Sequence, residues 1–391
     1  MQKEGKAKRV KNRKKKMLNK KFYEAIALLV GVIIGAGILG IPYVMWKAGF
    51  LTGLIDMILI GLAILFVNLA LGEVILRTEG KHQLTGYAEI YLGKWGKRLM
   101  SFSFVFGVYT ALIAYIIGEG ISINALFGFD SFYSSIIFFL VFSAIVYFGL
   151  KIVGESELYM TSAKILIFIG ICAAIILSGK FNASNLAEFN PALIFLPYGV
   201  ILFAFVGTAA VPEMKEILAE NRNEMKKALI IGTLIPFLMY IIFGAVVVGI
   251  SGNNTTEVAT VGLGITVGAY MIILGNVFAI VAMATSFLGL GLALRDVFIY
   301  DFKVDQKISW FLTFSVPLIV FLAGASSFIG VLGISGAVAG GIDGILITLM
   351  HHKAKKSGRR KPEYSIADNP LIKWLVVLVF AAGIVYALSV I

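Results

Sequence analysis

The chain has 391 residues, of which 59% are hydrophobic and 14% charged, and its mean hydropathy is +0.93. Apolar runs of about 20 residues recur along it, long enough to cross a hydrocarbon core of roughly 30 Å, and they exclude a soluble globular protein. The net charge of +12 lies between these runs, with no RNA-reading aromatic pattern beside it, so no nucleic-acid partner is expected. The single cysteine, Cys172, lies within an apolar run and excludes a disulfide framework or a cysteine-based metal site.

The hydropathy pattern predicts an all-α integral membrane protein with about eleven transmembrane helices. Residues 1–21 are a basic cytoplasmic tail, and residues 351–369 are predicted to form a flexible cytoplasmic linker before an extra C-terminal helix at 370–391. The transporter core, 22–350, divides into two halves of five helices, 22–178 and 192–350, which must have opposite topology. The predicted spans are 22–47, 50–76, 97–125, 132–150, 153–178, 192–218, 226–250, 262–299, 308–326, 328–350 and 370–391.

The placement of positive charge predicts the orientation. With the N-terminus inside, cytoplasmic segments hold 31 of the 34 Lys and Arg residues; Lys47 and Lys180 lie outside, and Lys164 lies within a span. By the positive-inside rule the chain is a multi-pass protein of the cell (plasma) membrane, with its N-terminus cytoplasmic and its C-terminus outside. The basic tail is expected to contact anionic lipid, and Glu73 to lie at the cytoplasmic interface.

Two matched motifs interrupt the first and sixth predicted spans. In GAGILGIP, residues 35–42, and GTAAVP, residues 207–212, a glycine is followed five residues later by a proline. Glycine and proline weaken a helix, and an unpaired peptide group in hydrocarbon costs several kcal/mol, so an interruption persists only where something fills it. Two interruptions in corresponding halves indicate the binding site of a transporter. The alternative is that Gly and Pro merely kink tightly packed helices.

The exposed peptide groups at such interruptions suit a zwitterion. Helix N-termini favour a carboxylate and helix C-termini favour a cation. The amides of Ala36 and Gly37 are therefore candidates for a substrate carboxylate, and carbonyls near Ile33 and Val206 for its amino group. An amino acid satisfies both sets at once.

Spans five and eight carry candidates for ion coupling. Lys164 lies about eleven residues into span five, roughly 16 Å deep, where an ammonium costs at least about 2.5 kcal/mol unless it is paired or hydrated. Ala282, Thr285 and Ser286 share one helical face and offer hard oxygen ligands for a small cation. Alternatively, Lys164 reaches an interface, and the two hydroxyls bond back to their own helix or join helices.

Tyr109 and Tyr115 in span three are candidate pocket walls, although buried tyrosines often simply pack. An enzyme is not expected, because the three histidines lie at the predicted cytoplasmic edges and no phosphate-binding loop is present.

The chain resembles the amino acid–polyamine–organocation superfamily, and within it the amino acid/auxin permease branch, which includes hydroxy- and aromatic-amino-acid permeases. The strings IIGAGILGIPYVMWKAGF, LPYGVILFAFVGTAAVPEM and ATSFLGLGLALRD carry the resemblance, which covers nearly the whole chain except the basic tail. It implies a five-plus-five inverted repeat, with substrate held at the discontinuous helices 1 and 6.

The resemblance also assigns ion positions. The carbonyls of Gly31, Ile34 and Ala282 with the hydroxyls of Thr285 and Ser286 match the second sodium site of the superfamily. Some proton-coupled relatives place a lysine in the fifth helix, as Lys164 is placed, with a glutamate seven residues before it, as Glu157 is here. Two cations a few ångströms apart repel strongly, so one site does not hold both. Protons are favoured, and sodium is the alternative.

The resemblance further implies that Phe203 and Phe205 cap or line the substrate pocket, with Phe203 as a thin gate. The sequence therefore predicts a cation-coupled symporter of small to medium neutral amino acids that works by alternating access and needs no cofactor beyond the coupling ion. The alternatives are an amino acid exchanger and a non-transporting sensor on the same fold. The substrate-binding candidates are Ile33, Gly35, Ala36, Gly37, Tyr109, Phe203, Phe205, Val206, Gly207 and Thr208.

Overall fold

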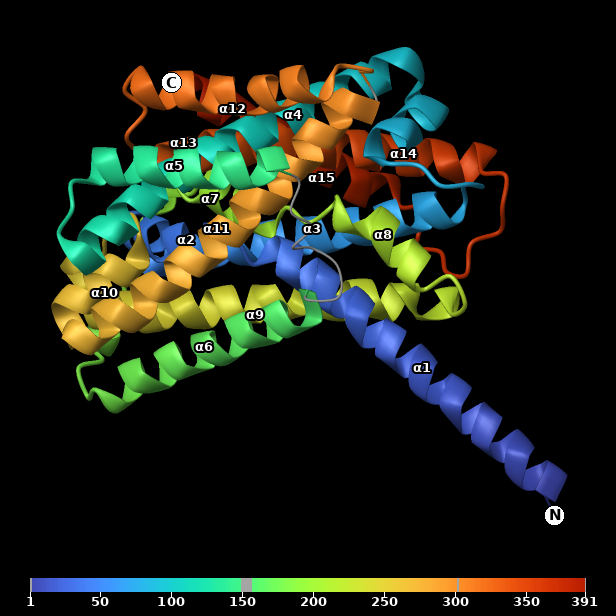
Figure 1. The fold of residues 1–391 in the computed structure, drawn as a ribbon, viewed down its shortest axis with the longest axis horizontal. Helices are drawn as coiled ribbons and strands as arrows, with labels where there is room; N and C mark the ends of the chain where they lie inside the picture. The colour runs from blue at the N-terminus through green and yellow to red at the C-terminus, as the bar shows by residue number, and fades with distance from the viewer. Residues whose placement is uncertain (1, 149–156, 301, 391) are drawn as a thin grey trace.

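Long apolar helices lie side by side and make up the molecule (Figure 1). The computed structural model describes residues 2–148, 157–300 and 302–390, and within these ranges it contains helices and connecting segments but no strand. Helices are expected for an apolar chain in lipid, because the backbone N–H and C=O groups of a helix pair with each other within the same segment.

The helices follow the predicted spans in order. Seven helical stretches of the described residues are long and apolar enough to cross a membrane, and α1 with α2 forms a further span bent by 54°. Two shorter apolar helices, Thr161–Leu177 and Gln306–Leu322, together with the α7–α8 pair, account for the remaining predicted spans. The helices are α1 Gln2–Ile33, α2 Gly37–Lys47, α3 Phe50–Leu76, α4 Leu84–Phe127, α5 Ser131–Phe148, α6 Glu157–Leu177, α7 Tyr198–Phe205, α8 Ala210–Ile217, α9 Met225–Ser251, α10 Ala259–Val267, α11 Ala269–Tyr300, α12 Gln306–Leu322, α13 Phe328–Ser335, α14 Gly341–Ser357 and α15 Pro370–Val390.

Several boundaries differ from those predicted. The basic tail is helical and continues into the first span, so α1 begins at Gln2 and extends beyond the bundle in Figure 1. The predicted eighth span is divided into α10 and α11 at Gly268, whose φ of 138° a helix does not accept. The tenth span contains a π-helical segment, Gly336–Gly340. The predicted junction of spans four and five, at residues 150–153, lies outside the described residues.

The two interrupted spans are surrounded by other helices. The first half of the first span, α1, packs against α6, α8 and α9, and its second half, α2, packs against α7 and α9. On another side, the long helix α4 contacts α5, α11, α13 and α14. The interruptions are therefore enclosed by protein, which is where non-helical backbone is tolerated at membrane depth.

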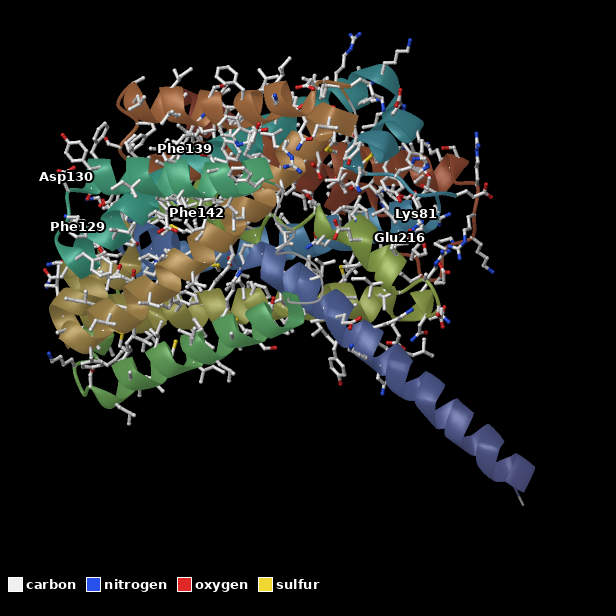
Figure 2. All side chains as sticks on the ribbon, in the orientation of Figure 1. Lys81, Phe129, Asp130, Phe139, Phe142 and Glu216 are labelled. Carbon is white, nitrogen blue, oxygen red and sulfur yellow. The ribbon has the colours of Figure 1, made fainter. Side chains whose placement is uncertain are left out.

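The two ends of the bundle differ in charge. Figure 2 shows Lys81 and Glu216 at one end and Phe129 and Asp130 at the other. At the first end, the Lys81 ammonium pairs with the Glu216 carboxylate at 2.5 Å and links the segment before α4 to α8. Most of the Lys and Arg residues after the tail lie in segments at this end, which we call the basic end.

Candidate functional site

The first interruption lies between α1 and α2. Helix α1 ends at Ile33 and α2 begins at Gly37, so residues 34–36 are not helical. Ala36 is the N-cap of α2, and the Gly37 amide belongs to its first turn. The first amides of a helix have no partner within that helix, so this end can donate hydrogen bonds to an anion.

The second interruption has the same form. Helix α7 ends at Phe205, α8 begins at Ala210, and Val206–Ala209 are not helical. Val206 has an extended backbone with ψ of 115° and is half-buried, Gly207 and Thr208 are buried, and Ala209 is exposed. Both predicted interruptions are therefore present in the fold.

The two interruptions face each other and are in contact. A Cβ on Gly37 would lie 2.5 Å from the Cα of Ala204, and a Cβ on Gly207 would lie 2.5 Å from the Cγ1 of Ile33. Each glycine thus packs on the last turn of the helix before the other interruption. Only glycine permits this approach, because a real Cβ does not come so close to another heavy atom.

Tyr240, in the middle of α9, links the two interruptions, and no motif in the sequence marks it. Its hydroxyl lies 2.7 Å from the carbonyl oxygen of Ile33 and 2.9 Å from that of Ala204, and the residue is fully buried. These carbonyls are at the C-terminal ends of α1 and α7. A tyrosine amid the apolar residues of span seven was the available signal, but its type alone does not separate this role from packing.

Lys164 reaches the first interruption from α6. Its ammonium donates a hydrogen bond to the carbonyl oxygen of Ile34 at 3.4 Å, and its side chain is buried. One turn earlier, the Thr161 hydroxyl donates to the carbonyl of Ala27 at 3.3 Å and so joins α6 to α1. The side chain of Glu157, the first residue of α6, lies outside the described part of the chain.

Helix α11 brings Ser286 to the same point. A Cβ on Gly35 would lie 3.4 Å from the Ser286 hydroxyl oxygen and 3.7 Å from that of Tyr115 in α4. Thr285 instead donates within its own helix, to the carbonyls of Val281 at 2.9 Å and Ala282 at 3.1 Å. Gly31, the remaining member of the predicted ion set, is half-buried in the last turns of α1.

The aromatic candidates take different positions. Phe203 is half-buried near the end of α7. Phe205 is fully buried and packs its ring on those of Phe237 and Tyr240, so it belongs to the core behind the interruptions. The Tyr109 hydroxyl donates to the carbonyl of Leu312 in α12 at 2.9 Å. Of the two candidate tyrosines in α4, it is therefore Tyr115 that reaches the first interruption.

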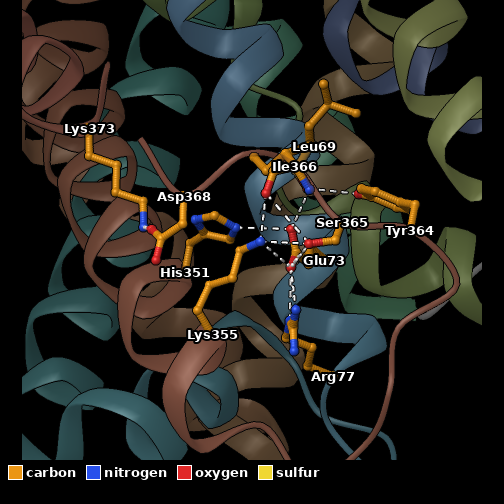
Figure 3. Close-up of polar contacts among 10 residues, drawn as sticks. All are labelled: Leu69, Glu73, Arg77, His351, Lys355, Tyr364, Ser365, Ile366, Asp368 and Lys373. Atoms are coloured by element: carbon orange, nitrogen blue, oxygen red, sulfur yellow. Dashed lines mark hydrogen bonds and ion pairs between the residues drawn. The ribbon is translucent and has the colours of Figure 1, made fainter. Parts of the chain in front are cut away.

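A second polar centre, not recognised in the sequence, lies at the basic end (Figure 3). The Glu73 carboxylate, near the C-terminal end of α3, is fully buried within the protein. It pairs with Arg77 at 2.8 Å and with Lys355 and His351 of α14, both at 3.1 Å. It also accepts hydrogen bonds from the Ser365 hydroxyl at 3.0 Å and the Ile366 amide at 2.8 Å.

Through Glu73, residues 358–369 are tied to α3, and we call this segment the strap. The Tyr364 hydroxyl donates to the carbonyl of Leu69 at 2.7 Å, and the Arg360 guanidinium donates to that of Leu76 at 2.8 Å. Asp368 pairs with Lys373 of α15, and this hydrogen bond lowers the pKa of Asp368 below its ordinary value. The predicted flexible linker is thus a docked segment, because its polar groups find partners on α3.

Two interrupted helices that face each other inside an apolar all-helical bundle define a secondary transporter of small solutes.

Comparison with known proteins identifies the family. The tryptophan/tyrosine permease family profile matches residues 18–389, and the chain belongs to that family. It is 26% identical over 384 residues to the tyrosine-specific transport system 1 of Haemophilus influenzae, covering 92% of this chain and 95% of the relative. It is 25% identical over 336 residues to glutamine transporter 2 of Aliivibrio fischeri, covering 82% and 86%.

Among solved structures, MhsT in complex with L-phenylalanine has the same fold. The TM-score is 0.67 at 15% sequence identity, and the match covers 94% of this chain and 97% of MhsT. The predicted superfamily, the all-helical fold and the transporter class are thereby confirmed, and the chain is an amino acid permease.

Proposed function

We propose that this permease is a proton-coupled symporter of neutral amino acids, with aromatic side chains as the first candidates, and that it works by alternating access. The observation that carries the proposal is the Lys164 ammonium at the carbonyl of Ile34, directly at the first interruption. The family and the tyrosine-specific relative support the substrate class.

The two interruptions supply groups for a zwitterion. The amides at the start of α2, those of the N-cap residue Ala36 and of Gly37, suit the substrate carboxylate because a helix N-terminus carries partial positive charge. The carbonyls that end α1 and α7 suit the ammonium for the opposite reason. Phe203, half-buried at the end of α7, is the candidate gate.

Lys164 is the proposed proton carrier. A buried ammonium next to a helix end is stabilised by the carbonyl it contacts, whereas a neutral amine loses the charge that strengthens this hydrogen bond. Protonation thus changes the strength of the link between α6 and α1, and it offers a way to couple a proton to the movement of α1. Sodium is the second candidate, because the Ser286 hydroxyl also faces the first interruption, but a sodium ion there would be repelled by a charged Lys164.

The distribution of charge supports a location in the cell membrane with the basic end cytoplasmic and the C-terminus outside. The basic residues of the tail would then face anionic lipid at the inner surface.

The test is uptake into proteoliposomes under separate proton and sodium gradients, with a panel of amino acids. Lys164→Ala should abolish accumulation driven by a pH gradient while substrate exchange without a gradient persists. Lys180→Ala is the matched control, because Lys180 also donates to a backbone carbonyl, that of Thr266 at 2.8 Å, but lies exposed beyond the membrane core.

Three outcomes would contradict the proposal. Normal proton-driven accumulation by Lys164→Ala would remove the assigned carrier, and wild-type accumulation with sodium alone would change the ion. Binding without any transport by the wild type would favour a sensor.

A further inference from the structure

The strap borders a cavity at the basic end of the molecule. The cavity has a volume of about 530 Å³ and opens to solvent between the end of α3 and the strap. Of the nine described residues that line it, four are cationic and one is acidic; the charged ones are Arg77, Arg359, Arg360, Lys361 and Glu363. A hollow with this excess of positive charge attracts an anion.

The cations of this cavity are not equally available to a ligand. Arg360 is committed to the strap, because its guanidinium donates to the carbonyl of Leu76 and pairs with Glu363. Arg359 and Lys361, on either side of it, are exposed and pair with no acid among the described residues. Two positive charges next to each other in space are therefore left without a compensating anion.

A second, smaller cavity adjoins the first. Its volume is about 270 Å³; it shares Arg360 and Glu363 with the first cavity and is otherwise lined by residues 219–223, which follow α8. Arg222 is half-buried here, and its Nε atom is buried with no hydrogen-bond partner in the described part of the chain. A buried donor of a charged group is costly to leave unpaired, so this atom indicates that an acceptor belongs in the cavity.

The strap leads into the last membrane span, which places both cavities near the expected membrane surface. Helix α15 begins at Pro370, and the side chain of Trp374, one turn later, is exposed. Tryptophan is enriched at the level of the lipid headgroups. The phosphate groups of the lipids are therefore expected at about the height of the strap.

We propose that the two cavities form a binding site for the phosphate-bearing headgroup of an anionic phospholipid, held by Arg359, Lys361 and Arg222. A guanidinium can donate two parallel hydrogen bonds to one phosphate, and an ammonium adds a compact positive charge. A headgroup bound there would join the strap to the segment after α8, the second half of an interrupted span. The site is separate from the two interruptions and does not depend on the substrate or the coupling ion.

The test measures the melting temperature of the delipidated protein in detergent with phosphatidylglycerol, phosphatidylcholine or inorganic phosphate. Phosphatidylglycerol should raise it by several degrees, because a ligand that binds only the folded state stabilises that state. Phosphatidylcholine should not, since its choline group offsets the phosphate charge. Inorganic phosphate at the same concentration should not either, because it lacks the acyl chains that concentrate a lipid at the protein. Phosphatidylglycerol should also slow tryptic cleavage of the wild type within residues 359–361.

Two variants test the assigned residues. Arg359→Gln combined with Lys361→Gln, and separately Arg222→Gln, should each reduce the rise caused by phosphatidylglycerol to about half or less. The matched control combines Lys94→Gln with Arg98→Gln, which removes two exposed positive charges from α4. It should keep the full rise. Each variant is compared with its own melting temperature without lipid, so a change in its intrinsic stability does not enter the comparison.

Three outcomes would overturn the inference. An equal rise in all variants and in the control would mean that the lipid acts on the basic surface or the tail as a whole. An equal rise with inorganic phosphate would identify free phosphate as the ligand, and no rise in the wild type would mean that the cavities bind no headgroup. None of these results bears on proton coupling or substrate, so the proposed function is tested separately.

Discussion

Thr285 has a hydroxyl that is already bonded within α11, to the carbonyls of Val281 and Ala282. Such back-bonding is the ordinary state of a threonine inside a helix. If protons drive transport, Thr285→Val should leave uptake unchanged at any sodium concentration, because the shape is kept and the lost hydrogen bond is local. Uptake measured over a range of sodium concentrations provides the check.

Ser286→Ala is the comparison for this variant, since Ser286 faces Gly35 at the first interruption. We expect it to weaken substrate affinity where Thr285→Val does not. A loss of sodium-stimulated uptake in Thr285→Val would instead identify Thr285 as a sodium ligand and contradict the proton-coupled proposal.

At the scale of single residues, the sequence predicts how deep in the membrane a residue lies, but not which neighbouring helix its side chain faces. The depth of Lys164 predicts that its ammonium needs a partner, and the structure places it at the first interruption. Tyr109 and Tyr115 are six residues apart, which is about 240° around a helix of 3.6 residues per turn, so they point to different neighbours. Which of them faces the interruptions depends on how α4 packs. The position of Tyr240 between two carbonyls that are distant in the sequence depends on how α9 packs. Local sequence does not show how either helix packs.

At the scale of elements, the contact between interruptions depends on Gly37. Adding a Cβ there brings it within 2.5 Å of the Ala204 Cα, so α2 or α7 must shift. Overpacking of this kind costs about 1–3 kcal/mol and here displaces binding groups. Gly37→Ala should therefore abolish exchange while the protein still inserts and remains monodisperse, as size-exclusion chromatography in detergent would show.

Gly289→Ala in α11 is the matched control, because a Cβ at that position meets nothing within 4 Å. It should keep full exchange and be as stable as the wild type or more so, since alanine is the better helix former. Full exchange by Gly37→Ala would show that the two interruptions need not touch for substrate to bind.

Local signals explain which elements the sequence could predict. Both interruptions follow from nearby Gly and Pro residues, which act within one helical turn. The polar residues after position 350 predict that the tenth span ends there, yet α14 continues to Ser357. His351 and Lys355 lie on one face of this extension and contact Glu73, a partner 278 positions away from His351 in the sequence. A hydropathy pattern does not predict a contact between residues so far apart in the sequence.

At the scale of the whole molecule, the strap joins the end of the second repeat to the first. Through Glu73 it connects α14 and the start of α15 to α3, which lies within the first five spans. The repeats of such transporters move against each other, so a link between them restricts which movements are available. The Glu73 carboxylate is the centre of this link, because cationic side chains, a hydroxyl and a backbone amide all bond to it (Figure 3).

Glu73→Gln should therefore release the strap and destabilise the fold. The substitution keeps the shape but removes the negative charge that pairs with Lys355 and Arg77, and losing one member of a buried ion pair costs on the order of 3 kcal/mol. We expect a melting temperature in detergent several degrees lower, and faster tryptic cleavage within residues 359–361. Glu79→Gln, at an exposed position in the following turn, should change neither measurement. Unchanged melting and cleavage in Glu73→Gln would mean that the other contacts, such as those of Tyr364 and Arg360 with α3, hold the strap without the charge.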